Sequence, residues 1–125
     1  MNTVLWICQV FLAALFLFSG SMKSTQSERW LVAHNQTGVE GLPMPLIKFI
    51  GIAEILGAAG VILPWWLGVA PVLTPIAALG FAVIMMLAAP IHYRRKEPQN
   101  VLINVLVLLV SLFVAWGRLQ GLYPM

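Results

Sequence analysis

A single carboxylate lies in the middle of an apolar stretch of this sequence. Glu54 is the only charged residue between Phe49 and Leu63. A carboxylate inside a membrane-spanning helix is costly unless it is neutralised, paired or hydrated, so its side chain should face other protein. We therefore predict that Glu54 belongs to a functional site, with Lys23 as its basic partner. A purely structural ion pair between Glu54 and Lys23 is the alternative.

Three further residues are candidates for contact with a ligand. His92 is a candidate proton carrier, because histidine changes its charge near neutral pH; an interfacial histidine without chemistry is the alternative. Asn104 lies in an apolar stretch, where such residues either bind a ligand or join helices by hydrogen bonds. Met85 recurs at helical spacing with His92 and so shares its face, with core packing as its other role.

Other cofactor chemistry finds no support in the sequence. The chain has two histidines, His34 and His92, and one cysteine, Cys8. These residues make no zinc-type ligand set, and one cysteine allows neither an internal disulfide nor a CxxC pair. No phosphate-binding loop, dinucleotide fingerprint or nucleophile elbow occurs. We therefore predict no metal site and, at most, a non-autonomous subunit of an enzyme.

The composition indicates which elements must position these residues. The chain has 125 residues, of which 61% are hydrophobic and 9% charged, against roughly 45–50% and about 25% in soluble domains. This excludes a water-soluble globule. Apolar runs long enough to cross a membrane as helices lie at residues 4–22, 46–63, 69–91 and 101–116. We predict a single domain, residues 1–125, folded as an all-α integral membrane four-helix bundle.

The basic residues predict how this bundle is oriented. With four spans, the first and third connectors lie on one side of the membrane, and that side holds every Lys and Arg except Arg118. Because basic residues near span ends favour the cytoplasm, both termini are expected outside (N-out/C-out). The pI near 9.5 is explained by this arrangement, so no nucleic-acid partner is predicted.

The connectors between the spans are predicted to differ. The segment at 23–45 is expected to form a long cytoplasmic loop between the first two helices, with a short helix capped by Ser27. Residues 64–68 are expected to form a tight turn, and residues 93–100 a short basic turn.

The predicted orientation brings several polar residues into the cytoplasmic half of the bundle. Gly51 and Gly57 lie at helical spacing from Glu54, and such small residues let another helix approach closely. If the polar faces meet around Glu54, the bundle encloses a pocket open toward the cytoplasm. The residues predicted to act chemically there are Glu54, Lys23 and His92, and those predicted to bind the ligand are Gly20, Gly57, Met85 and Asn104.

Three segments of the sequence resemble a known family. Residues 18–23 (FSGSMK) close the first span, residues 54–64 (EILGAAGVILP) run through the second, and residues 88–92 (AAPIH) end the third. In this order they resemble the DoxX-like family of small prokaryotic membrane proteins, over almost the whole chain. By that resemblance, the family's characteristic positions are Gly20, Lys23, Glu54, Gly57, Pro64 and His92. The resemblance implies a bacterial inner-membrane protein with redox work beside the quinone pool.

Three functions remain open at this point. The first is a bundle that binds a quinone-like or other small amphipathic molecule, as accessory or subunit of a membrane redox system whose electrons come from a partner protein. A bound quinone is the only cofactor this implies, and any enzyme activity would be that of a quinone-linked oxidoreductase subunit. The second is a non-catalytic assembly or scaffold protein. The third is a proton-coupled transporter of a small solute, working as a homo-oligomer. All three place the chain in a lipid bilayer.

Overall fold

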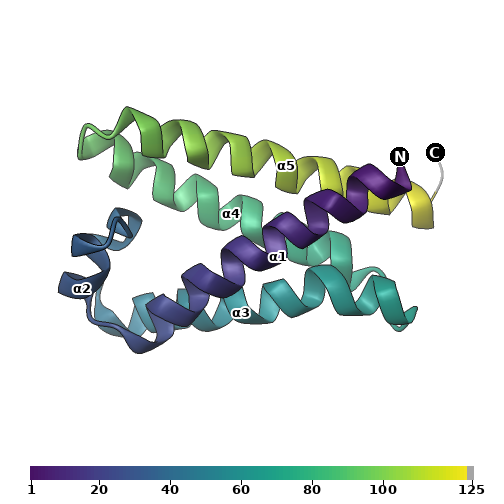
Figure 1. Ribbon diagram of the computed structural model, residues 1–125, viewed down its shortest axis with the longest axis horizontal. Helices are drawn as coiled ribbons and strands as arrows, with labels where there is room; N and C mark the ends of the chain where they lie inside the picture. Colours follow the sequence, from purple (N-terminus) through teal and green to yellow (C-terminus); the bar gives the residue numbers. More distant parts are fainter. Residues whose placement is uncertain (124–125) are drawn as a thin grey trace.

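Four long helices form the body of the molecule, as predicted. The computed structural model describes residues 1–123, within which no strand occurs. The long helices are α1 (Asn2–Thr25), α3 (Met44–Leu67), α4 (Leu73–Arg94) and α5 (Pro98–Leu122). Each is long and apolar enough to cross a membrane. They form a ring in which α1 packs on α3, α3 on α4, α4 on α5, and α5 on α1 (Figure 1).

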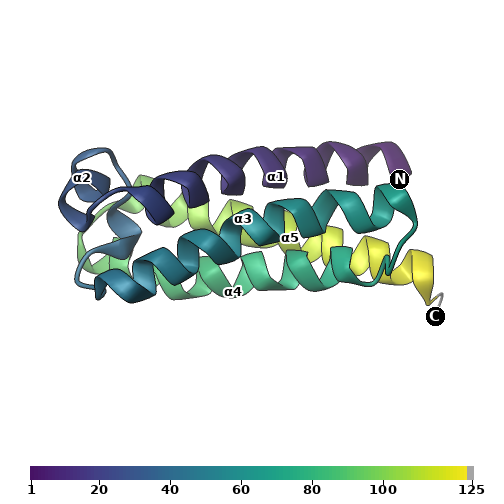
Figure 2. The ribbon, with the colours of Figure 1, turned by 90° about the horizontal axis from the view of Figure 1, so that it is seen from below.

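Two short elements cover one end of this bundle. These are α2 (Glu28–Ala33) and the 3-10 helix η1 (Thr37–Val39), which follow each other between α1 and α3. Figure 2 shows α2 at the end opposite to the two chain termini. We call this end the loop end and the other the termini end. The predicted cap is confirmed, since the Ser27 side chain accepts a hydrogen bond from the backbone N–H of Trp30 at 3.2 Å.

The long loop expected between the first two spans is not what the structure shows. α1 continues to Thr25 and α3 begins at Met44, and most residues between them belong to α2 and η1. The physical reason is burial, because Leu31 of α2 and Val39 of η1 pack with Ile47 of α3 in a small core of their own. A loop would have left these apolar side chains in contact with water.

The prediction of a tight turn at residues 64–68 is wrong. α3 continues through Pro64 to Leu67 and ends at Gly68, whose φ is 71°. Glycine adopts this left-handed conformation without strain and commonly ends helices. A proline inside a membrane-spanning helix is tolerated because neighbouring groups satisfy the freed backbone carbonyl. The turn between α3 and α4 therefore lies at residues 68–72, and the basic turn before α5 is reduced to residues 95–97.

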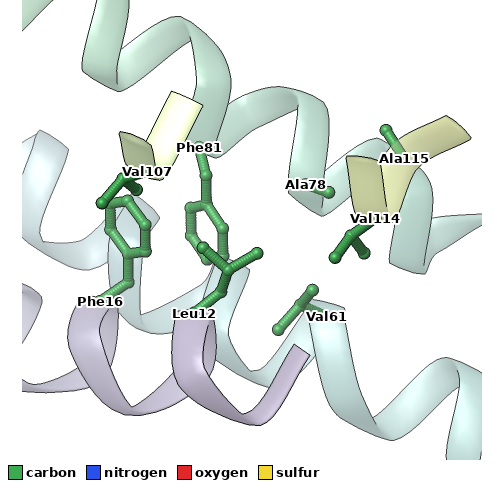
Figure 3. Close-up of a cluster of buried hydrophobic side chains, with 8 residues drawn as sticks. All are labelled: Leu12, Phe16, Val61, Ala78, Phe81, Val107, Val114 and Ala115. Carbon is green, nitrogen blue, oxygen red and sulfur yellow. The ribbon is translucent and has the colours of Figure 1, made fainter. Parts of the chain in front are cut away.

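The main core is built from all four long helices (Figure 3). Phe16 of α1 stacks on Phe81 of α4, with ring centroids 3.9 Å apart and planes 5° from parallel. In the most apolar part of each long helix only 28–33% of the residues are buried. Most of the apolar surface therefore faces outward, which a protein surrounded by water does not sustain and a lipid environment favours.

Candidate functional site

The two predicted partners, Glu54 and Lys23, form a buried ion pair. Nζ of Lys23 donates a hydrogen bond to Oε2 of Glu54 at 3.0 Å, and Oγ of Ser19 donates to Oε1 at 2.9 Å. Glu54 is 0% exposed and Lys23 is 8% exposed. Both oxygens of the buried carboxylate are thus hydrogen-bonded, as a buried charge requires. The pair joins α1 to α3 in the half of the bundle nearer the loop end.

Two glycines allow α1 and α3 to approach closely enough for this pair. A Cβ on Gly20 would lie 2.5 Å from the carbonyl oxygen of Gly51, and a Cβ on Gly51 would lie 2.7 Å from the backbone nitrogen of Ser24. Any side chain at either position would push the helices apart. Gly57 has a comparable role against α4, because a Cβ there would lie 2.5 Å from Cε1 of Phe81. Gly20 and Gly57, which we predicted to bind the ligand, therefore lie at helix contacts.

A cavity of about 640 Å³ opens beside the ion pair. We call it the inner cavity. Its wall is largely apolar, with contributions from all four long helices and from the segment that holds η1. The predicted site residues that line it are Lys23, Met85, His92 and Asn104, and Ser19 also contributes. Glu54 is not among the lining residues, so it lies behind Lys23 and Ser19 and holds them in place.

Asn104 lines the inner cavity and has a buried hydrogen-bond donor without a partner. Its side chain is 6% exposed, and within residues 1–123 its Nδ2 has no hydrogen-bond partner. A buried polar group without a partner costs about 1–3 kcal/mol.

His92, which lines the inner cavity, belongs to a second polar cluster. Its Nδ1 lies 3.0 Å from Oγ1 of Thr37 and 2.9 Å from Oε1 of Glu97. Hydrogen bonds from Thr37 and His92 hold the pKa of Glu97 at about 2, below its ordinary value of 4.5. Thr37 lies on η1 and Glu97 directly precedes α5. This cluster therefore holds η1 against the ends of α4 and α5.

Glu97 and Thr37 were not predicted as site residues. We interpreted residues 93–100 only as a basic turn, although Glu97 is the one acid in that segment. Arg95 also binds this acid, since its Nε donates to Oε2 of Glu97 at 3.1 Å, and it forms a second ion pair with Glu40. The signal in the sequence was an isolated carboxylate five residues after a candidate histidine.

A third polar cluster lies at the termini end. Arg118 of α5 is 4% exposed, and its Nε donates to Oε1 of Gln9 at 2.6 Å. Its guanidinium also lies 4.5 Å from the ring centroid of Trp65 and 5.5 Å from that of Trp6. Gln9 in turn donates to the carbonyl oxygen of Val61. These contacts join α1, α3 and α5 at the end of the bundle away from the inner cavity.

Comparison with known proteins agrees with the pattern of motifs. No curated protein and no solved structure matches the chain. The model of the DoxX-like family matches residues 7–114, which include the buried ion pair, His92 and Asn104. With its four apolar helices, the chain is a membrane protein that belongs to the DoxX-like family.

Proposed function

We propose that this protein binds a small amphipathic molecule, quinone-like in its chemistry, in the inner cavity. The observation that carries the proposal is the composition of the cavity wall, in which a few polar groups converge on a largely apolar space of about 640 Å³. Ligand pockets typically have volumes of about 300–1,000 Å³ and this mixture of lining groups. An apolar ring with polar oxygens matches such a wall better than a fully polar solute does.

The buried pair supports a role for Lys23 in holding the ligand. One N–H of its ammonium is bonded to Glu54, and an ammonium has three donors, so two remain for an oxygen in the cavity. Glu54 keeps the charge of Lys23 balanced while Lys23 donates to a ligand carbonyl. A proton exchanged between this carbonyl and the pair would serve quinone chemistry. Electrons would come from a partner protein, which makes this chain an accessory or subunit of a membrane redox system.

The orientation of the chain is part of the proposal. The loop end carries Arg29, the run at 94–96 and most other basic residues, whereas the termini end carries Arg118. Under the positive-inside rule the loop end faces the cytoplasm of a bacterial inner membrane and both termini face outward. The inner cavity then lies in the cytoplasmic half of the bundle. Fusion of a reporter that is active only in the cytoplasm to the C-terminus should give an inactive reporter.

A cavity-filling variant with a matched control tests the proposal. Ala53 lines the inner cavity, whereas Ala59 lies on the same helix and is exposed. The protein is purified gently from membranes and analysed by mass spectrometry and absorption for a retained quinone. Wild type and Ala59→Phe should retain it, and Ala53→Phe should not. Equal retention by the two variants would place the ligand elsewhere and overturn the proposal.

The scaffold alternative is less well supported by the packing. Its expected docking face on α3 contains Gly51 and Gly57, and both are occupied by α1 and α4 of the same chain. The Glu54→Gln substitution separates these functions, because it preserves shape and removes the charge that balances Lys23. Ligand binding, or transport of a proton-coupled solute, should collapse in this variant, whereas assembly with a partner should largely survive.

A further inference from the structure

His92 directs its two ring nitrogens to different environments. Nδ1 faces Thr37 and Glu97, at 3.0 Å and 2.9 Å. Nε2 has no hydrogen bond within residues 1–123, and it lies 3.1 Å from the point where a Cβ on Gly38 would stand. Gly38 and His92 both line the inner cavity. One nitrogen is therefore engaged at the loop end, and the other is free beside the space assigned to the ligand.

The partners of Nδ1 determine which nitrogen carries the proton. The hydroxyl of Thr37 donates its single proton to Oε1 of Glu97 at 2.6 Å, so its oxygen is left to accept. Glu97, with a pKa of about 2, is ionised at neutral pH and can only accept. Because both neighbours are acceptors, Nδ1 must carry a proton. In the neutral ring the lone pair is then on Nε2, toward the inner cavity.

We propose that Glu97 and Thr37 are positioning residues that make Nε2 of His92 a proton acceptor for a hydroxyl-bearing ligand. The ligand class is a phenol or quinol with an apolar body. This inference rests on the proposed function, because it uses the same cavity. In the transfer, the O–H bond of the ligand breaks as the N–H bond at Nε2 forms. The ligand becomes an oxyanion, His92 becomes an imidazolium, and Glu97 stays ionised and accepts from Nδ1–H.

The charges around His92 fit this role. Lys23 faces the inner cavity from α1 and Arg94 from α4, whereas the part of the wall contributed by α3 holds no titratable residue. Both cations favour an oxyanion in the cavity. Among residues 1–123, Glu97 is the only acid bonded to His92, and Arg95 holds its second oxygen. The oxyanion and the imidazolium thus each have a counter-charge in place.

Matched probes separate this inference from the proposed function. The full chain in lipid nanodiscs is dialysed against 1-naphthol, against its methyl ether and against menadione, a quinone that has no hydroxyl, with empty nanodiscs as the blank. The ether has the ring of the naphthol but no hydroxyl proton. Phenolic hydroxyls titrate near about pH 10, so the naphthol stays protonated at pH 8. Glu97→Gln and His92→Asn are compared with Glu28→Gln, which removes an equal charge from α2.

The wild type should bind the naphthol roughly five-fold more tightly than the ether at pH 8, the range of one hydrogen bond. Glu97→Gln and His92→Asn should lose the preference at pH 8 yet still bind menadione, and Glu28→Gln should keep it.

Two results would overturn the inference. The first leaves the proposed function intact, and the second overturns it as well. If Glu97→Gln weakens the binding of all three probes equally and keeps the preference for the naphthol, Glu97 only holds η1 in place. The proposed function then survives. If the wild type binds none of the probes, menadione included, the proposed function fails together with the inference.

Discussion

The ammonium of Lys23 and the carboxylate of Glu54 meet 3.0 Å apart across the contact between α1 and α3. Neither group is more than one-tenth exposed. The attraction between the two charges is therefore the main interaction that offsets the free-energy cost of removing each of them from water. This relationship makes the pair an electrically balanced unit inside an apolar bundle. It also explains why Lys23, rather than Glu54, lines the inner cavity: the carboxylate is fully used by Lys23 and Ser19.

The pair should show strong coupling in a double-mutant cycle. Lys23→Met alone, or Glu54→Met alone, leaves one buried charge without its partner and should cost about 3–5 kcal/mol of unfolding free energy. The double variant replaces both charges by apolar side chains and should be near wild-type stability. Unfolding of the purified protein in detergent measures all four species. Additive single effects would show that the two charges are not balanced by each other.

The close contact between α1 and α3 should not tolerate a methyl group. Gly51→Ala places a Cβ 2.7 Å from the backbone of Ser24, and we expect a loss of about 1–3 kcal/mol from the forced helix shift. Gly80→Ala is the matched control, because a Cβ at Gly80 meets nothing within 4 Å. That variant should be as stable as the wild type or slightly more stable. Equal melting temperatures for the two variants would contradict the packing described above.

Stability should depend on pH through Glu97. Its pKa in the folded protein is about 2, against an ordinary value of 4.5. A carboxyl group whose pKa is lowered by folding stabilises the protein fully above the ordinary value, and the contribution is lost as the pH falls through the folded value. Wild type should therefore melt above Glu97→Gln near neutral pH, and the difference should shrink as the pH falls to about 2. A difference that stays constant over this range would show that the carboxylate is not the cause.

Much of the fold could be predicted from the sequence because hydropathy is a strong local signal. Four apolar runs were sufficient to place four helices, and Asn104 in the last run, a predicted ligand-binding residue, is buried. The helix ends were less predictable. Pro64 was taken as the start of a turn, but a proline does not end a membrane helix when tertiary contacts satisfy the backbone.

The candidate site was predictable only where a charged residue lies in an otherwise apolar stretch of sequence. Glu54 was identified because an acid in an apolar run requires a partner, and Lys23 is that partner. Glu97 lies in a polar turn, where an acid is ordinary, so its position five residues after His92 was only a weak signal for the contact between them. The contacts of Thr37 with His92 and Glu97 depend on η1 packing against α4, which is a tertiary arrangement without a local pattern.

Ligand binding by a variant that lacks the pair but keeps the fold tests the central claim most directly. Menadione affinity is measured by equilibrium dialysis in nanodiscs for wild type and for the Lys23→Met, Glu54→Met double variant, once their melting temperatures have been shown to agree. A hydrogen bond from a charged donor is worth about 1.5–3 kcal/mol, so the double variant should bind at least about tenfold more weakly. Unchanged affinity in the stable double variant would contradict the account, because the ion pair would then have no part in holding the ligand.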